Sequence, residues 1–568
     1  MAGDLRGVGP GSDSGGMRTR VLGQRAPLLW LLLPWMTGLV LGKAMTTPEA
    51  AKWGCLIAAM GLAALAVGRA AVGGWVWGWA LAGSVGCAGV VAYDEARGRL
   101  AEWETLPPRE VAVDVRLERR FGAGRDPRVL SGWGEVVRAP RHVQDLVGQR
   151  IHLSTRLGPG WRGGRPEVSA VVRVEGRLTR VERSPPADSF TGYLAGQGVN
   201  FSISPGVVKE QREAPGPYAA FCGRVAERLR GILGRGLEAR PAESAILRAM
   251  LLGEQEALTA RQKEVFTRTG TLHVFSISGL HIGVIAVALA GVLTALRLGA
   301  WGTFLGTAVL LWLYVDVTGR APSAVRAFAM VVLVQAAWVW SRPRAAVPAL
   351  VASAMGVLLV APQQLFGASF QMSYGIVASL LLLGLPLSEA WQERIRPWAL
   401  LPPESWNWAQ RAVAATARGV AGSLAIGLAT APVSVVAGVL YFRLLTLGAV
   451  AANLVVVPLA SLALLAGFAS MVSGLVGFET GSVVFNHGAA LVLAVMDRFL
   501  VFAEGVPGMY RAASFGDATF GFAALVGVLA LMLVGFHHGW ERRVGGFWPP
   551  FAFTALVLIW LVMRGPAG

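Results

Sequence analysis

Two histidines, two serines and a glycine lie within nine residues of a segment that otherwise continues as an apolar run. The segment is HVFSISGLH, and the residues are His273, Ser276, Ser278, Gly279 and His281. Polar groups in a membrane-spanning segment are costly and usually face the bundle interior or a water-filled path. A serine beside a histidine can form a nucleophile and its base, and imidazoles can ligate a metal ion. These residue types therefore indicate a functional site.

The spacing permits contact without completing a catalytic or metal site. At 100° per residue, His273 and His281 would lie about 80° apart on one helix and could line one side of it, although Ser278-Gly279 could loosen or break that helix. A hydrolase using Ser278 or Ser276 with His281 as base would lack a recognisable oxyanion group and third orienting group. A metal or small-solute transporter would have at most two histidine ligands here. Close helix packing, where serine and glycine are common, is a further interpretation.

Three more polar islands interrupt later apolar runs. DVTGRAPSAVRAF cannot be a continuous lipid-facing helix, because its proline removes a backbone donor and the freed groups need partners. Its aspartate and second arginine fall within the adjoining apolar windows, which favours an ion pair within the protein or a lining role. GASFQMSYG and YFRLLTLGAVAANLVVVPLA are each compatible with packing as well as function. The candidate positions in the three islands are Asp316, Arg320, Ser323, Arg326, Gln371, Ser373, Asn453 and Pro458.

The composition places these islands in a membrane protein. Hydrophobic residues make up 54% of the 568 residues and charged residues 15%, which excludes an ordinary soluble domain of this length. A spanning helix needs about 20 mostly apolar residues, and this rule predicts about a dozen spans. The apolar windows are 27–42, 53–68, 74–93, 274–297, 300–317, 324–340, 346–361, 367–386, 418–440, 447–475, 480–503, 517–536 and 549–563.

The net charge of +17 comes almost entirely from arginine, since the chain has only four lysines. Arginine suits a protein that handles polyanions, but GC-rich codon usage produces the same bias, so the charge alone identifies no partner. Arginines precede the first apolar run, which favours a cytoplasmic N-terminus. No cleavage site is obvious after that run, so we expect an uncleaved first helix. The three cysteines suggest neither a disulfide framework nor a metal site.

Residues 94–217 differ in pattern from the rest of the chain. VAVDVRLERR, QRIHLSTRLG and EVSAVVRVEGRLTRVE alternate apolar and polar residues between turn signals, which is typical of a small antiparallel β-barrel or sandwich. Between residues 97 and 183, eighteen arginines stand against eleven acidic residues. Basic residues interleaved with aromatics suit the binding of single-stranded nucleic acid, although a solvated sheet face gives the same pattern. The candidate contacts are Arg116, Arg119, Arg120, Trp133, Arg138 and Trp161.

Residues 218–270 are expected to form amphipathic helices that lie along the membrane surface or cap the bundle. Beyond them the chain is apolar nearly to its end, apart from the polar insert 387–411, whose tryptophans suit an interfacial segment. One apolar face of the amphipathic region is formed by Ile246, Leu247, Met250 and Leu251.

Together and in this order, the islands resemble the competence domain of the ComEC family of DNA-uptake channels. The matching runs are ILRAMLLGEQEALTARQKEVFTRTGTLHVFSISGLHIG, TGRAPSAVRAFAM, GASFQMSYGIV and LATAPVSVVAGVLYFRLLTLGAVAANLVVVPLA. The LxGExxxLTxxxxxxFxxTGTxHxxxISGLHxG pattern of the first run is highly specific. FTGYLAGQGVNFSISP, which closes the β-rich segment, resembles the OB-fold-like domain that precedes the competence domain in this family. The resemblance covers about residues 26–510.

This resemblance implies a polytopic inner-membrane channel that passes one strand of incoming DNA to the cytoplasm, with a DNA-handling domain on the extracytoplasmic face. It implies that His273, Ser276, Ser278, Gly279 and His281 line or gate the path, followed by the eight positions of the other islands. Polar and cationic walls suit the passage of a polyanion. The implied partners are single-stranded DNA, membrane lipid, a DNA-receptor protein and a cytoplasmic ATP-driven motor. The motor would be a separate protein, because no GxxxxGK[ST] ATP-binding run occurs in this sequence.

One feature of the family pattern is missing from this sequence. Many members end in a metallo-β-lactamase-like domain, proposed to degrade the strand that is not imported, with a metal site built on an HxHxDH run. The seven histidines of this chain contain no such run. We therefore expect no catalytic centre, metal or cofactor here and a separate nuclease as a further partner. A role other than DNA uptake, such as envelope maintenance, stays open, as does the oligomeric state.

The predicted fold class is a polytopic α-helical membrane protein with one small β-rich, OB-fold-like extracytoplasmic domain. The predicted division is 1–93 for a tail and about three spans, 94–217 for the β-rich domain, 218–270 for amphipathic helices, 271–510 for the channel and 511–568 for C-terminal spans.

Overall fold

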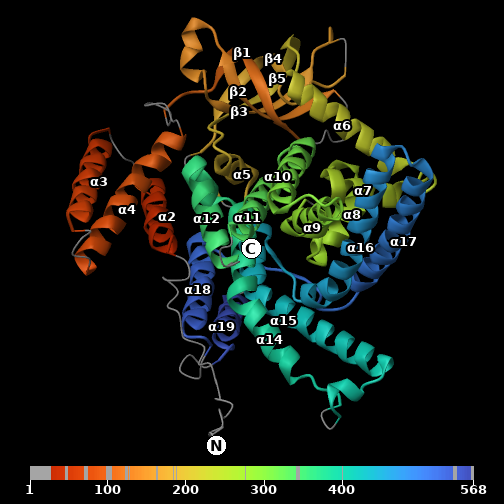
Figure 1. Ribbon diagram of the computed structural model, residues 1–568. Helices are drawn as coiled ribbons and strands as arrows, with labels where there is room; N and C mark the ends of the chain where they lie inside the picture. The colour runs from red at the N-terminus through yellow and green to blue at the C-terminus, as the bar shows by residue number, and fades with distance from the viewer. Residues whose placement is uncertain are drawn as a thin grey trace, which may run out of the picture.

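The fold consists of a β-barrel that lies on one end of a large bundle of helices (Figure 1). The computed structural model describes residues 27–44, 49–69, 74–97, 105–121, 126, 128–161, 164–182, 185–186, 188–275, 277–340, 346–398, 401–540 and 546–564.

In the described part of the chain before the barrel, three helices form a group at one side of the bundle (Figure 1). They are α2 (Leu29–Ala44), α3 (Glu49–Arg69) and α4 (Trp75–Arg97). Glycines let α2 and α4 approach closely, because a Cβ atom on Gly38 would lie 2.0 Å from the Gly86 carbonyl oxygen. Helix α4 continues to Arg97, three residues past the predicted start of the β-rich domain at residue 94.

The barrel has five strands in the closed order β1-β2-β3-β5-β4. Strands β3 and β5 are parallel and the other neighbours are antiparallel, which is the arrangement of an OB-fold. Alternate residues such as Val113, Val115 and Leu117 fill the interior. The β-rich prediction is therefore confirmed. The elements are β1 (Arg109–Arg120), β2 (Val129–Arg138), η1 (Arg141–Leu146), β3 (Arg150–Leu157), β4 (Val171–Arg180), α5 (Phe190–Gly196) and β5 (Phe201–Glu213).

The bundle begins directly after β5. Its elements are α6 (Pro217–Gly234), α7 (Pro241–Leu252), η2 (Gln255–Ala257), α8 (Ala260–Arg268), η3 (Leu272–Phe275), α9 (Gly279–Ala295), α10 (Ala300–Val317), α11 (Pro322–Val339), α12 (Ala346–Val360), η4 (Pro362–Phe366), α13 (Ala368–Ser379), the π-turn η5 (Leu380–Gly384), α14 (Leu385–Arg394), η6 (Pro403–Ser405), α15 (Trp408–Phe442), β6 (Leu444–Leu445), α16 (Ala449–Val476), α17 (Glu479–Glu504), β7 (Arg511–Ala512), α18 (Ala518–His537) and α19 (Pro549–Arg564).

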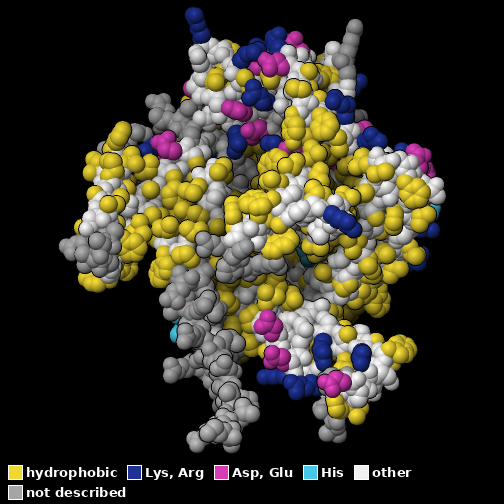
Figure 2. Space-filling model, in the orientation of Figure 1, with side chains coloured by type: hydrophobic (Ala, Val, Ile, Leu, Met, Phe, Trp, Pro, Cys, Tyr) yellow, Lys and Arg dark blue, Asp and Glu magenta, His cyan; other side chains and the backbone are white. Residues whose placement is uncertain are grey.

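The helices confirm a multi-pass membrane protein. Within the described ranges, nine helices are long and apolar enough to cross a membrane, and α2, α9, α12 and α19 are shorter apolar helices. Figure 2 shows a broad band of hydrophobic side chains, with charged side chains gathered on the barrel at one end and near the α14–α15 turn at the other. A slab of apolar surface between two charged ends is the form that a bilayer requires.

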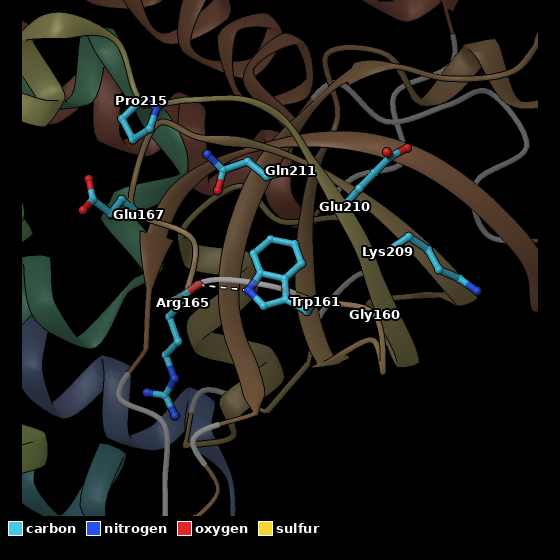
Figure 3. Close-up of a pocket in the computed structure, with 9 residues that line it drawn as sticks. Gly160, Trp161, Arg165, Glu167, Lys209, Glu210, Gln211 and Pro215 are labelled. Atoms are coloured by element: carbon cyan, nitrogen blue, oxygen red, sulfur yellow. Dashed lines mark hydrogen bonds between the residues drawn. The ribbon is translucent and has the colours of Figure 1, made fainter.

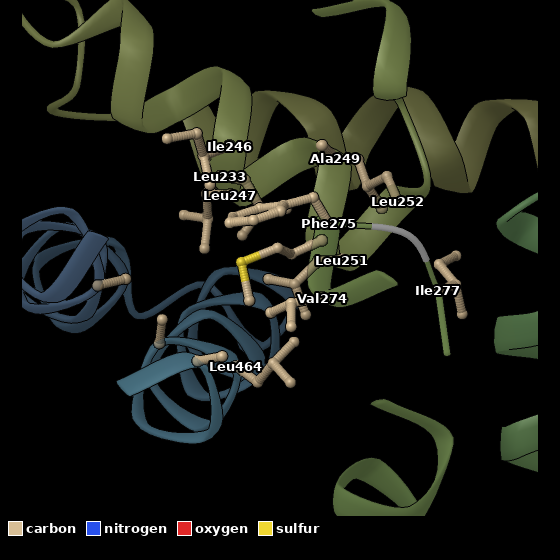
Figure 4. Close-up of a cluster of buried hydrophobic side chains, with 14 of the residues drawn as sticks. Leu233, Ile246, Leu247, Ala249, Leu251, Leu252, Val274, Phe275, Ile277 and Leu464 are labelled. Atoms are coloured by element: carbon tan, nitrogen blue, oxygen red, sulfur yellow. The ribbon is translucent and has the colours of Figure 1, made fainter. Parts of the chain in front are cut away.

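The amphipathic region packs more deeply than the sequence predicts. Pro241 begins α7, and Gly253 ends it in the left-handed region with φ 76°. The predicted apolar face of α7 lies in the largest helical core, against Phe275 of η3 and Leu464 of α16 (Figure 4). The apolar face of α7 is therefore covered by other helices of the bundle. Its partners come from distant segments that the periodicity of one helix cannot identify.

Candidate functional site

The HVFSISGLH segment is not one continuous helix, because η3 ends at Phe275 and α9 begins at Gly279. His273 lies in η3 and is exposed, whereas His281 lies in the first turn of α9 and is fully buried. Gly279 is the first residue of α9, and Ser276 lies outside the described residues. The expected break at Ser278-Gly279 is confirmed. Placing both histidines on one face of one helix is wrong, because the helix starts between them.

Ser278 and His281 cap the N-terminus of α9 through a contact with each other. The Ser278 amide donates to Nδ1 of His281 at 3.3 Å, and the Ser278 hydroxyl lies 2.8 Å from the same nitrogen. This pairing satisfies a backbone donor that has no partner inside the helix. Nε2 of His281 is buried and has no hydrogen-bond partner among the described residues. The contact is that of a helix cap, and none of the described carboxylates bonds to the imidazole as in a catalytic triad.

The second island forms the turn between α10 and α11, with Arg320 at φ 51°. Asp316 forms an ion pair with Arg320 across this turn and accepts a hydrogen bond from the Tyr218 hydroxyl of α6 at 2.6 Å. The bond to Asp316 raises the pKa of Arg320. The expected ion pair within the protein is thus present, but the partner of Asp316 is Arg320 and not Arg326, which lies farther along α11.

Arg326 is the largest fully buried side chain of the described chain, with 1% of its surface exposed. Its Nη2 donates to the carbonyl oxygen and to the hydroxyl of Ser369, each at 2.7 Å. Among the described residues no carboxylate lies within ion-pair distance of it. An arginine buried in an apolar bundle with neutral partners is costly in free energy.

Helix α11 joins the first three islands. Ser323 donates to the Ile277 carbonyl, just before α9, at 2.6 Å, and Arg326 contacts Ser369 at the start of α13. In the third island, Gln371 donates to the Leu365 carbonyl at 3.0 Å and accepts from the Tyr441 hydroxyl of α15 at 2.7 Å. The tertiary structure therefore brings together segments that are far apart in the sequence.

The remaining island positions are not joined to this group by hydrogen bonds in the described part of the chain. Ser373 is half-buried on α13. Asn453 is half-buried near the start of α16, where its Oδ1 has no hydrogen-bond partner among described residues. Pro458 is exposed and lies inside α16, which continues through it.

Three sets of ion pairs in the structure were not predicted from the sequence. Glu504, at the end of α17, has 7% of its side chain exposed and binds two arginines of α8, Arg261 at 2.5 Å and Arg268 at 2.9 Å. Glu254, in the LxGE motif, binds Arg230 of α6 at 2.6 Å, and Asp188 binds Arg443 at the end of α15. An isolated glutamate at the end of an apolar run was the only signal for Glu504.

On the barrel, the candidate nucleic-acid contacts separate into buried, paired and open positions. Trp133 has 6% of its surface exposed and lies under the guanidinium of Arg119, 5.3 Å from the ring centre. Arg138 pairs with Glu213 at 2.7 Å, Arg120 donates to the Pro166 carbonyl at 3.2 Å and Arg116 is exposed. Trp133 therefore offers no open ring face for stacking in this structure.

Trp161 lines a surface pocket of about 590 Å³ beside β5 (Figure 3). Its indole N–H donates to the Gly164 carbonyl at 3.0 Å, which fixes the ring in the loop after β3. Arg165 and Lys209 line the same pocket. As for metals, the described residues contain no group of three or more His, Cys, Asp or Glu side chains that could hold an ion.

Comparison with known proteins gives a family and two relatives. The family described as Competence protein matches residues 250–538, just over half of the chain. ComE operon protein 3 of Bacillus subtilis (strain 168) is 37% identical over 151 residues, which cover 25% of this chain and 18% of the relative. Competence protein ComA of Neisseria gonorrhoeae is 33% identical over 146 residues, covering 24% and 21%. Each match thus spans about a fifth of the relative's length, and no solved structure matches.

The family match begins in α7 and ends just after α18, so it includes all four polar islands and the α11 contacts that join three of them. This chain belongs to the Competence protein family.

Proposed function

We propose that this protein takes part in DNA uptake during competence, as a channel of the cytoplasmic membrane that passes a single DNA strand into the cell. Family membership and the two relatives named for competence support the process. The observation that carries the channel itself is Arg326, a fully buried arginine whose hydrogen bonds to described residues both go to Ser369.

The chemistry of Arg326 suits a path for phosphates. Burying a cation without a counter-charge costs free energy, and natural bundles tolerate it where an anion or water enters. A passing phosphodiester supplies a bidentate partner for the guanidinium. Ser323 holds the broken segment before α9 against the same helix, so Ser278, Gly279 and His281 form part of the wall beside it. The other island positions, among them Gln371 and Asn453, are second-tier lining candidates.

The charge distribution supports an orientation with the barrel outside the cell. The α14–α15 turn, which carries Arg394, Arg396 and Arg411, lies at the end of the bundle opposite the barrel (Figure 1). Positively charged short loops favour the cytoplasmic side. The barrel would then meet incoming DNA first, and a DNA receptor would act on that side. A motor would act beside the α14–α15 turn, and a separate nuclease would remove the other strand.

Transformation of the native host tests the proposal. A deletion strain is complemented with wild type, Arg326→Ala, His281→Ala or Arg297→Ala, the last being an exposed arginine in the α9–α10 turn. We expect the first two variants to abolish transformation while the protein stays in the membrane, and Arg297→Ala to restore it. Normal transformation of the deletion strain would exclude the channel role in that host.

One observation favours a second candidate, an intramembrane hydrolase with Ser278 as nucleophile. The Ser278 hydroxyl lies 2.8 Å from His281 Nδ1, a distance that suits a nucleophile and its base. We propose instead that the pair is a structural cap, since no oxyanion donor or orienting carboxylate completes it. A covalent serine probe that labels wild type and not Ser278→Ala would establish the hydrolase, whereas absence of labelling removes it.

A further inference from the structure

The face of the barrel that an OB-fold normally offers to nucleic acid is covered in this protein. OB-folds bind oligonucleotides on the face of strands 2 and 3 and on the adjoining loops. Here α5, which lies in the β4–β5 connection, packs its rings over that face. Phe190 of α5 lies 5.3 Å from His152 of β3, and Tyr193 lies 6.0 Å from Trp133 of β2, centre to centre. Trp133 and His152 are consequently buried.

Helix α5 is held in this position from the membrane side. The Asp188–Arg443 ion pair fixes the residues before α5 to the end of α15, and Arg97 of α4 donates to the Ala195 carbonyl at 2.5 Å. Gly196 lies against Gly367 before α13, since a Cβ atom there would be 3.5 Å from the Gly367 Cα. Removing α5 from the barrel would break contacts to two other parts of the bundle. Single-stranded DNA would therefore have to contact the barrel at a different place.

The open alternative is a double pocket where the loop after β3 meets the ends of β2 and β5. Its larger part measures about 590 Å³ and its smaller part about 320 Å³. Trp161, Gly164 and Arg165 line both parts. Volumes of about 300 to 1,000 Å³ are typical of small-ligand sites, so the double pocket has room for a nucleotide.

Trp161 has the properties of a preformed stacking surface. It is half-buried against the barrel core, and its N–H bond to the Gly164 carbonyl at 3.0 Å fixes the ring plane. Figure 3 shows the indole among side chains that come from its own loop and from β5. A ring that is already fixed loses little conformational entropy when a base stacks on it.

Cationic side chains line both parts of the pocket. Arg165 donates to the Asp126 carbonyl at 2.9 Å, and Arg128 lines the smaller part of the pocket. Arg120 donates to the neighbouring Pro166 carbonyl, and desolvation, followed by the charge of Arg165, lowers its pKa. The repulsion between these two guanidinium groups would be relieved by a phosphate. The acidic groups on the rim are Glu167 and Glu210, and Glu210 pairs with Arg212 at 2.8 Å.

We propose that the Trp161 pocket is the contact of the barrel for single-stranded DNA, with one base stacked on Trp161 and phosphates bound by Arg128 and Arg165. The identity of the ligand rests on the proposed function. The α5-covered face of β2 and β3 takes no part in this contact.

Binding of a fluorescent oligothymidine to the purified full-length protein in neutral-lipid nanodiscs tests the pocket. Trp161→Ala should weaken binding about 5- to 150-fold, the range for loss of one base stack, and Trp161→Phe should restore most of it. Arg165→Ala should lower the slope of log Kd against log salt by about 0.7, as expected for one lost phosphate contact. The matched controls Phe190→Ala on the covered face, Trp408→Ala at the opposite end and Arg177→Ala on β4 should bind almost as wild type.

The pocket proposal is overturned if Trp161→Ala binds the oligonucleotide with wild-type affinity, or if Phe190→Ala loses more affinity than Trp161→Ala. Hydrogen exchange of the β3 and β5 peptides must match wild type, so that a loss of binding is not a loss of fold, and Trp161→Phe keeps the test valid if the alanine variant unfolds. Unchanged binding by Trp161→Ala together with lost transformation by Arg326→Ala removes the pocket and leaves the channel. Weakened DNA binding by Trp161→Ala, together with a deletion strain that transforms normally, supports the pocket and excludes the channel role.

Discussion

The surface arginines of the barrel and Arg326 of the bundle have opposite surroundings. On the barrel, arginines such as Arg138 and Arg212 pair with carboxylates at the surface, where Arg138 bonds Glu213 at 2.7 Å and Arg212 bonds Glu210 at 2.8 Å. In the bundle, Arg326 is fully buried, and its hydrogen bonds within the described chain go to the neutral Ser369. Surface pairs cost little to form and contribute little, whereas a buried unpaired charge is maintained against its desolvation cost. The difference sets Arg326 apart from the paired arginines at the barrel surface.

Replacing Arg326 by methionine tests that contrast most strongly. Methionine has a similar length and no charge, so Arg326→Met removes the desolvation cost while filling the space. We expect a thermal unfolding midpoint in detergent that equals or exceeds that of wild type, together with transformation below detection. Arg297→Met, at an exposed position, is the control for both measurements. A destabilised protein that still transforms would mean that Arg326 is a structural residue.

Glu504→Gln should destabilise the bundle by about 2 kcal/mol. The change leaves Arg261 and Arg268 facing each other without their shared carboxylate, and the half-exposed arginines keep the cost below that of a fully buried pair. The free energy of unfolding in denaturant measures it. A double-mutant cycle with Arg268→Ala isolates the coupling. Additive effects on the free energy of unfolding would show that the contact between Glu504 and Arg268 contributes no coupling energy.

A smaller effect concerns pH and the covered face of the barrel. Desolvation by burial lowers the pKa of His152 in the folded barrel, while the unfolded chain keeps the usual value of about 6.5. The unfolded state therefore binds more protons below that pH, so the stability of the barrel is complete above about pH 6.5 and falls as the pH drops below it. Hydrogen exchange of the β3 peptide between pH 7 and pH 5, after correction for intrinsic exchange, measures this. His152→Gln should remove the dependence, whereas the exposed His142→Gln should keep it.

The smallest effect should come from the surface pairs of the barrel. Arg138→Ala breaks the pair with Glu213, in which both side chains are largely exposed. We expect a change in the free energy of unfolding within about 0.5 kcal/mol, and still less at high salt. A loss comparable with that of Glu504→Gln would contradict the distinction between barrel and bundle.

The spans and the barrel were predictable because their signals are local. The window 300–317 coincides with α10, and the window 480–503 differs from α17 by one residue at each end. The alternating pattern of residues 94–217 likewise gave the β-rich domain. The apolar rule failed at mixed segments, since α15 begins at Trp408, ten residues before the predicted window. There the first turns carry polar side chains, and the Asn407–Gln410 capping box starts the helix instead.

The candidate site was predictable only in part. The sequence singled out Ser278, His281 and Arg326, but it could not reveal that α9 starts between the two histidines or that Asp316 pairs with Arg320. The choice of partner depends on turn geometry, here two residues with positive φ at Gly319 and Arg320. Burial of Trp133 under α5 was equally invisible, because a strand pattern gives the inward and outward faces without saying what covers them.

By itself, the sequence determined the membrane class, the order of spans and barrel, and the polar positions, since hydropathy, alternation and motif order are properties of short segments. Only the tertiary structure decided which of those positions meet. It brought Ile277 and Ser369 to Ser323 and Arg326 of α11. It also covered one face of the barrel with α5 and left the Trp161 pocket open. These outcomes depend on contacts between segments far apart in the chain, which arise only when the helices and the barrel pack together.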